Sequence, residues 1–363
     1  MAAIFWLNTG WNSDTILLGQ KALWILIKER DSMAEKVKNE HYVPQRYLKH
    51  FANGENFFVF DKEKTEKRPG NVGDYACERY FYDVDFDALK REKMEQDSNF
   101  EFDPEMERIM QTIDLQHIEH WFGQNVETWL FDPISKIIST YVMANPKNIE
   151  NMVAITDNDM NHISLYLAIQ MIRSKEFREN IKEMYERLPL LLMKKIAKTD
   201  EEREYINSIE LEIKNKNHLK LFHAQFLMDE EMVSDIAVRL RSKIWVIGYN
   251  KTDIPFITSD NPVVKYGHSG FNGINSKGIE IAFPISPKLI LILADIEEFG
   301  RLLPFHNHFV EIPSEKVHYY NSLQVIQSYR YVFSKRDEWE FVEKMLKDNP
   351  KLKDIKHKRF LMS

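Results

Sequence analysis

The alternation of hydrophobic and polar positions near the N-terminal end predicts a short helix packed on a β-hairpin. Apolar residues over 44–51 recur at the i, i+3 and i+4 spacing of an amphipathic helix, with a proline in its first turn. Aromatic and β-branched residues over 56–60 predict a strand, and residues 80–82 predict a second extended piece. The charged run over 61–68 is typical of a turn between them.

A helical pattern extends from about residue 104 to 241. Its clearest periodic segment covers 156–185, where apolar residues repeat along one face behind Asp157 as a cap. Residues 201–217 are heavily charged, which indicates either a solvent-exposed hairpin arm or lid, or an ordinary surface segment. Further helices are predicted over 105–122 and 129–143.

Beyond residue 242 the pattern changes to short β-branched runs divided by Gly, Pro, Asn and Ser, which predict a mostly antiparallel sheet. No linker or shift in composition separates this part from the N-terminal hairpin. We therefore expect one α+β domain over residues 33–346, in which the helical middle packs against a sheet built from both ends. The predicted C-terminal elements are strands over 243–248, 256–258, 262–265, 278–283, 288–294 and 330–333, and helices over 314–329 and 337–346.

The composition is that of a globular protein. Of the 363 residues, 44% are hydrophobic and 29% are charged. The net charge of -7 disfavours a surface that is basic throughout, although it leaves room for a local basic groove. Cys77 is the single cysteine, which excludes an internal disulfide framework and predicts a cytoplasmic protein without a disulfide-linked partner.

The two ends of the chain differ from the rest. The apolar run over 16–27 is too short and too polar to span a membrane, and it lacks the features of a signal peptide, so no membrane association is expected. Met33 reads as a natural start, so we expect residues 1–32 to be an upstream translation or an accessory helix. Residues 347–363 are expected to form a basic, solvated tail.

The first candidate for chemistry lies at the start of the short N-terminal helix. A neutral imidazole at His41 could act as a general base or a metal ligand, and Gln45, one helical turn later, could orient it or a substrate. The alternative is that His41 caps the helix and bonds to the backbone. The sequence alone leaves both interpretations open.

A second candidate is the polar run over 259–262, which follows a hydrophobic strand and ends in proline, as a turn at a sheet end does. Asp260 could hold a divalent cation or act as a base, and Asn261 could be a neutral ligand or a donor. The alternative is an Asx turn in which Asp260 satisfies local backbone amides.

A third candidate is the helix face that carries Gln170 and Arg173, which point the same way because they are three residues apart. A buried Arg173 needs a partner, and Asp260 is the predicted one. Such a pair would either stabilise the fold or receive a phosphate or carboxylate group.

Other metal and nucleotide motifs are weak or missing. His117 and His120, with Asp114 on the same side, are one turn apart, but no third ligand is indicated and a surface helix is favoured. The chain has no phosphate-binding glycine loop, GxGxxG, CxxC, GxSxG or HExxH motif. This disfavours P-loop ATPases, dinucleotide dehydrogenases, zinc fingers and the common serine hydrolases.

Four motifs together give the chain a resemblance to a known family. They are the His-Tyr-Val-Pro-Gln opening over 41–45, the helix with Gln170 and Arg173, the phrase over 256–262, and Phe-Pro-Ile-Ser-Pro over 283–287. In this combination, from about residue 41 to 336, the chain resembles DUF4238, a family found largely in bacteria without a settled activity. The resemblance marks positions in the chain and implies no chemistry.

These residues predict a hydrolase of the metal-dependent phosphodiesterase or nuclease type, acting on nucleic acid or a nucleotide. His41 and Asp260 would be catalytic, with Asp260 also holding a divalent metal ion. The residues expected to position the phosphate-containing substrate are Gln45, Gln170, Arg173 and Asn261. The alternative is a non-catalytic ligand-binding or sensing module, or an effector in bacterial defence, in which the same residues form a buried polar network.

Overall fold

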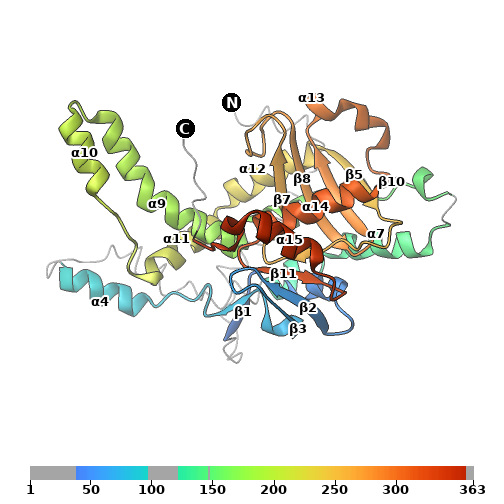
Figure 1. Ribbon diagram of the computed structural model, residues 1–363, viewed down its shortest axis with the longest axis horizontal. Coiled ribbons are helices and arrows are strands. Elements are labelled where there is room, and N and C mark those ends of the chain that lie inside the picture. Colours follow the sequence, from blue (N-terminus) through green and yellow to red (C-terminus); the bar gives the residue numbers. More distant parts are fainter. Residues whose placement is uncertain (1–37, 97–121, 146–147, 357–363) are drawn as a thin grey trace.

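The computed structural model describes residues 38–96, 122–145 and 148–356, and its strands there form three sheets (Figure 1). The predicted N-terminal extension over 1–32 and the paired histidines His117 and His120 lie outside the described residues. The end of the predicted basic tail, over 357–363, also lies outside them.

The largest sheet has five strands in the order β10-β5-β9-β8-β7, and only the β10–β5 pair is parallel among them. Its central strands are apolar at nearly every position because both faces are covered. Ile247 and Leu291 join the core that includes α8 (Asp157–Arg173), whereas Val246 packs with α14 (Ser314–Gln327) on the other face. The strands are β5 (Ile244–Tyr249), β7 (Val264–Gly267), β8 (Ile279–Ser286), β9 (Leu289–Ala294) and β10 (Phe309–Glu311).

The second sheet joins the two ends of the chain. Its order is β3-β2-β11-β6, so the N-terminal hairpin pairs directly with two C-terminal strands, all antiparallel. This confirms the α+β prediction in which both ends meet. The C-terminal strands nevertheless divide between two sheets. Pro262, which has no backbone N–H to donate, lies in the segment that connects β6 to β7. The strands are β2 (Asn56–Asp61), β3 (Glu66–Asn71), β6 (Thr258–Ser259) and β11 (Tyr331–Ser334), and β1 (Asn39–His41) forms a separate pair with β4 (Cys77–Arg79).

Helix α8 lies in the core of the helical middle. A capping box begins it, in which the Thr156 side chain accepts from the Asp159 amide and the Asp159 side chain returns to the Thr156 amide. The predicted helix over 156–185 is broken at Ser174, whose extended ψ of 151° ends α8 and whose side chain caps α9. The other helices here are α4 (Phe86–Gln96), α7 (Asp132–Met143), α9 (Lys175–Ile196), α10 (Asp200–Ser208), α11 (Lys216–Met228) and α12 (Glu230–Arg241).

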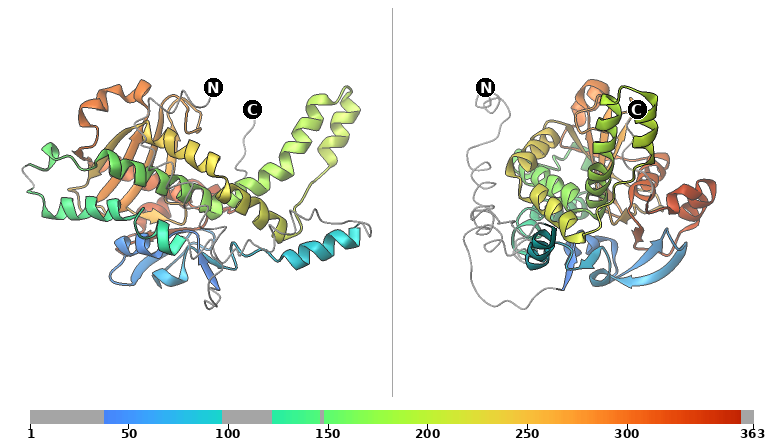
Figure 2. Two further views of the ribbon diagram at one scale, coloured as in Figure 1. Left: turned by 180° about the vertical axis from the view of Figure 1, so that it is seen from behind. Right: turned by 90° about the vertical axis from the view of Figure 1, so that its left-hand side faces the viewer.

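Helices α9 and α10 form a hairpin that projects from the body of the molecule. Both views of the chain show this hairpin extending away from the sheets (Figures 1 and 2). The charged segment over 201–217 therefore does contribute to an arm, as one of its two interpretations predicted. The arm also includes the outer half of α9, which the sequence did not mark.

The C-terminal elements complete the second sheet. Helix α15 (Glu340–Asp348) packs Val342 and Leu346 against Phe60 of β2, together with Trp339. Two short helices, α3 (Gln45–Leu48) and α13 (Ile296–Phe299), lie in connections. None of the helices in the described ranges is both long and apolar enough to cross a membrane. The domain boundaries at residues 33 and 346 remain predictions.

Candidate functional site

The segment that follows β1 brings His41 and Gln45 together. In the pairing of β1 with β4, His41 lies opposite Cys77, and the amides of the next two residues both reach the carbonyl of Ala76. The Nε2 atom of His41 lies 3.2 Å from the carbonyl oxygen of Gly73 and 3.3 Å from Nε2 of Gln45. In the neutral ring this nitrogen either donates to Gly73 or accepts from Gln45, and it cannot do both at once.

Burial makes His41 a weak base. Its side chain is almost completely buried, and this burial, together with the positive charge of Arg173, lowers the pKa of the imidazole to about 4. The ring is therefore neutral at pH 7. A neutral ring keeps one nitrogen as an acceptor, which is the state a general base or metal ligand requires.

One face of α8 carries three buried polar side chains. Tyr166, Gln170 and Arg173 stand at i, i+4 and i+7, so they lie along the same side of the helix. Nε2 of Gln170 donates to the carbonyl of Tyr42 at 3.0 Å, and Nη2 of Arg173 donates to the carbonyl of His41. Gln170 and Arg173 therefore hold the backbone of two successive residues, Tyr42 and His41.

The carboxylate beside Arg173 is Glu127, and the prediction that Asp260 fills this place was wrong. Glu127 follows a π-helical turn over 122–126, and its Oε1 atom lies 3.6 Å from Nη2 of Arg173. The same guanidinium lies over the ring of Phe122, 4.1 Å from the ring centroid. Burial raises the pKa of Glu127, and the charge of Arg173 opposes that rise.

Arg46, Glu127, Tyr166, Gln170 and Arg173 make up what we call the α8 polar cluster. Arg46 joins it because its Nη1 atom donates to the carbonyl of Glu127 at 2.6 Å. Burial raises the pKa of the Tyr166 phenol far above its ordinary range, and the charges of Arg173, Glu127 and Arg46 are close enough to modify that pKa. The cluster therefore combines two cations, one carboxyl group and two neutral polar groups.

Each of the two uncharged side chains of the α8 polar cluster buries one polar atom without a hydrogen-bond partner in the described part of the chain. The two atoms are the hydroxyl oxygen of Tyr166 and Oε1 of Gln170. Such an atom costs about 1–3 kcal/mol, so its occurrence calls for a specific reason. The cluster also reaches solvent, because the Glu127 side chain is 19% exposed. These two atoms are consequently the clearest sign of a binding position in the described protein.

The sequence analysis did not identify Tyr166 and Glu127, two members of this cluster. Tyr166 stands four residues before Gln170 on a face already singled out, so the helical spacing alone could have found it. Glu127 lies between two predicted helices, where no periodic pattern marks its orientation. Only the packing of the turn against α8 makes it the partner of Arg173.

Asp260 lies elsewhere, at the junction of β6 and β11. Its Oδ1 atom accepts from the amide of Tyr329, and its Oδ2 atom accepts from the amides of Arg330 and Tyr331, each at 2.8 Å. Burial raises the pKa of Asp260 to about 6, although these backbone donors lower it. This is the backbone-satisfying alternative considered for Asp260, and its catalytic and metal-binding roles remain predictions.

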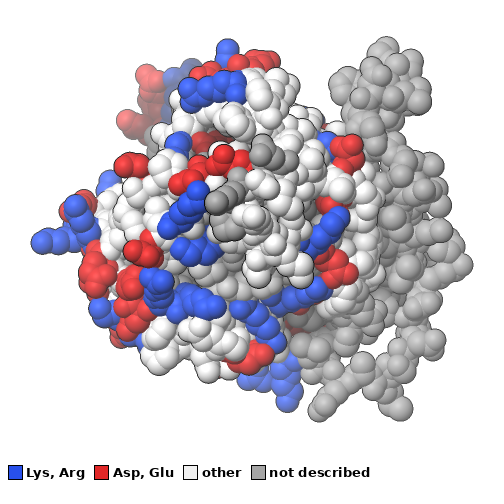
Figure 3. Space-filling model, turned by 90° about the vertical axis from the view of Figure 1, so that its right-hand side faces the viewer, with Lys and Arg blue, Asp and Glu red and all other residues white. Residues whose placement is uncertain are grey.

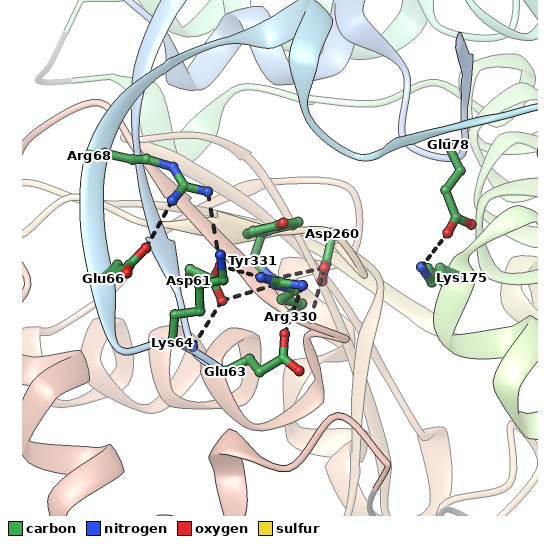
Figure 4. A network of polar contacts seen from close by, with 10 residues as sticks. All are labelled: Asp61, Glu63, Lys64, Glu66, Arg68, Glu78, Lys175, Asp260, Arg330 and Tyr331. Atoms are coloured by element: carbon green, nitrogen blue, oxygen red, sulfur yellow. Dashed lines mark hydrogen bonds and ion pairs between the residues drawn. The ribbon is translucent and has the colours of Figure 1, made fainter. Parts of the chain in front are cut away.

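Around Asp260 the chain forms a network of ion pairs (Figure 4). Arg330 binds the buried carboxylate of Asp61 with two bonds, from Nε at 3.0 Å and from Nη2 at 2.7 Å, and it also pairs with Glu63. Nδ2 of Asn261 donates to the carbonyl of Gln327 at 2.8 Å, so this predicted substrate-binding residue holds the end of α14. The network therefore ties the second sheet to α14.

Arg178 and His223 form a second buried polar group. Arg178 donates from Nε to Nδ1 of His223 at 3.0 Å and lies over the ring of Phe81, 3.3 Å from its centroid. Because Nδ1 of His223 accepts, Nε2 carries the proton and donates to the carbonyl of Ile172 at 2.7 Å. Burial lowers the pKa of Arg178 to about 10. These contacts join α9 and α11 to α8.

The described residues do not bring metal ligands together at one place. Within the described ranges, no three His, Cys, Asp or Glu side chains stand close enough together to hold a metal ion. On the coloured part of the face in Figure 3, positive and negative side chains intermingle. A mixed surface of this kind does not favour binding along a nucleic-acid backbone there.

Comparison with known proteins adds a family. The family model described as "Protein of unknown function (DUF4238)" matches residues 39–338. Neither the curated proteins nor the solved structures contain a significant match to the chain. The match spans β1 to β11 and so includes every member of the α8 polar cluster.

Proposed function

Because the chain belongs to the DUF4238 family, whose function is unknown, its activity has to be inferred from its residues, and we propose that it binds a phosphate-containing ligand at the α8 polar cluster. One observation carries this proposal. The Tyr166 hydroxyl and Oε1 of Gln170 are buried without a partner in the described chain, on the same helix face as a buried guanidinium. A ligand that bonds to both atoms would remove the cost of burying them.

The chemistry of the cluster indicates the class of ligand. Arg46 is paired with Asp132, 2.8 Å away, so Arg173 is the cation that lies on the helix face of the two atoms. Burial raises the pKa of Glu127, which weakens the negative charge opposite Arg173 and favours an anionic group on the ligand. Planar guanidinium groups bind phosphate well. Oε1 of Gln170 can only accept a hydrogen bond, which requires a hydroxyl or N–H group on the ligand. A nucleotide, or the end of a nucleic-acid strand, carries both kinds of group.

Hydrolysis of that ligand is a second candidate function, and the position of Glu127 beside Arg173 favours it. Burial raises the pKa of Glu127, which is the direction that a carboxyl group needs to act as a general acid. His41, neutral beside Arg173, would act as a base in the same reaction. Asp260 would serve as a metal ligand only if its carboxylate gave up the backbone amides that it now binds.

Calorimetric titration of the full chain with a panel of nucleotides and inorganic phosphate tests the binding proposal. We expect wild type to bind a nucleotide, and Tyr166→Phe to bind it about tenfold more weakly, the equivalent of one lost hydrogen bond. The control is Tyr47→Phe, because Tyr47 is equally buried but its hydroxyl already bonds to Thr258 and Pro284. Equal affinity of wild type and Tyr166→Phe, or no binding of any ligand in the panel, would overturn the proposal.

The hydrolytic candidate needs a separate measurement. Release of phosphate or nucleoside should be abolished in Glu127→Gln, which keeps the size of the side chain but cannot exchange a proton. Binding of the ligand should persist in that variant, since the positive charges remain. If the protein binds the ligand but releases no product, the binding function stands and hydrolysis of that ligand is excluded.

A further inference from the structure

The outer half of α9 carries an apolar stripe that faces solvent. Tyr185, Pro189, Leu192 and Ile196 are all exposed, with Leu192 at 54% and Ile196 at 77% of their full exposure. Their spacing of four, three and four residues places them along one side of the helix, in the pattern of a coiled-coil seam. Single exposed apolar residues are ordinary, but a continuous stripe of this length is a feature of contact surfaces.

Helix α10 does not cover the stripe. It packs against α9 through its own Ile206, which is buried, and directs Tyr205 outward at 69% exposure. Near the base of the arm, Tyr185 stacks on Phe222 of α11, with ring centroids 4.2 Å apart, yet its outer side stays exposed. The arm therefore presents apolar side chains from both of its helices to solvent.

The two helices of the arm carry charges of opposite sign that are unpaired in the described part of the chain. The end of α9 and the connection after it carry Lys194, Lys195 and Lys198, and α10 carries Glu201 and Glu204. None of these five side chains has an ion-pair partner within the described ranges. This differs from the base of α9, where Glu183 and Glu186 pair with basic residues along the helix.

We propose that the α9–α10 arm is a dimerisation surface whose occupant is the arm of a second copy of this chain. A two-fold contact places the same patch on both subunits, so the patch must be complementary to itself. A hairpin with an apolar stripe and lysines on one helix and glutamates on the other meets this requirement. In the dimer, the stripes pack on each other and the lysines of one arm face the glutamates of its partner.

The charges also argue against a lipid surface as the occupant. Lysines beside an apolar stripe would suit an anionic membrane. Helix α10, however, brings acidic residues to the same hairpin, including Asp200, Glu201 and Glu202 in its first turn. These carboxylates would be repelled by anionic headgroups, whereas a second arm would neutralise them.

Analytical ultracentrifugation of the full chain over about a hundredfold range of concentration tests the proposal, because a dimer depends on concentration. Wild type should sediment as a dimer at the upper end, and the double variant Leu192→Glu, Ile196→Glu should be a monomer throughout. Met143→Glu is the matched control, since Met143 is an exposed apolar residue on α7, away from the arm. Circular dichroism should be the same in all three proteins, and so should the thermal midpoint at a concentration at which none of them is dimeric.

A charge exchange makes the test specific for two arms. Lys195→Glu should weaken the dimer, and adding Glu201→Lys should restore it. A wild type that stays monomeric at every concentration would overturn the proposal. So would a monomer that binds vesicles of anionic lipid through the stripe, since the occupant would then be a membrane, and so would a dimer that survives the double variant.

Discussion

Burial shifts the pKa values of two neighbouring residues of β1 in opposite directions. Burial lowers the pKa of His41 to about 4 and raises the pKa of Glu40 to about 7, because in each case it disfavours the charged form. Arg173 adds to the effect on His41 and Asp74 opposes it, while Asp83 raises the pKa of Glu40. The two groups should therefore give the folded state opposite dependences on pH.

The pH dependence of each group can be isolated by substitution. Between pH 4 and 6.5 His41 is protonated in the unfolded chain but neutral in the folded one, so its contribution to stability rises with pH. The difference in unfolding free energy between wild type and His41→Asn should grow over this window, by up to about 3 kcal/mol. Urea unfolding at a series of pH values measures it.

Glu40 supplies the matched comparison. Its folded pKa lies above the unfolded value of 4.5, so its contribution is complete below pH 4.5 and is lost as the pH rises through about 7. The difference between wild type and Glu40→Gln should therefore shrink over the range in which the His41 difference grows. A difference that is independent of pH in both variants would contradict this account of β1.

The carboxylate of Asp260 stabilises the backbone by accepting hydrogen bonds from three amides. Asp260→Ala leaves the amides of Tyr329, Arg330 and Tyr331 without their acceptor, and we expect a loss of about 2–4 kcal/mol in unfolding free energy. Asp337→Ala, at an exposed position, should change it by less than about 0.5 kcal/mol. An Asp260→Ala variant as stable as wild type would show that Asp260 does not stabilise the fold, and it would strengthen the prediction that Asp260 is catalytic.

At the scale of elements, α8 determines where the polar cluster lies. Its start is fixed by the capping box of Thr156 and Asp159, and its end by the break at Ser174. Burial would raise the pKa of Asp159, but bonds from Thr156 and Lys136 outweigh it and keep that pKa below its ordinary value. The sequence predicted the start of α8 to within one residue, with Asp157 instead of Thr156 as the cap, but it did not predict the break at Ser174.

Two capping boxes of the same type, in different settings, allow a direct comparison. Thr156 caps α8 in the core, and Thr199 caps α10 on the arm, each with an acidic residue at the third helical position. Thr156→Ala should lower the global unfolding free energy by about 1 kcal/mol. Thr199→Ala should mainly speed hydrogen exchange in α10, because the arm can unfold locally. Equal global losses would show that the arm unfolds together with the core.

At the scale of the whole molecule, periodicity predicted the fold class but not the pairing of strands. The helical middle and the meeting of the two ends follow from patterns within each segment. The division into two large sheets depends on β11 inserting between β2 and β6, a contact between residues far apart in sequence that no local signal specifies.

The candidate site, like the fold, could be predicted from the sequence only in part. His41, Gln45, Gln170 and Arg173 come together from β1, α3 and α8, and the spacing within each segment could be predicted from the sequence. Glu127 was missed because its turn has no periodicity, and its place is decided by packing. The expected pairing of Asp260 with Arg173 failed for a related reason, because the insertion of β11 brings three backbone amides to the carboxylate of Asp260.

The central claim is that the Tyr166 hydroxyl is kept for a ligand, and the unfolding free energy of Tyr166→Phe tests it most directly. Tyr47→Phe should lose about 1–2 kcal/mol, because it leaves the buried partners of its hydroxyl unsatisfied. Tyr166→Phe, without ligand, should match wild type or exceed it, because it removes a buried polar atom that has no partner in the described chain. A loss in Tyr166→Phe as large as in Tyr47→Phe would contradict the claim, since the hydroxyl would then support the fold.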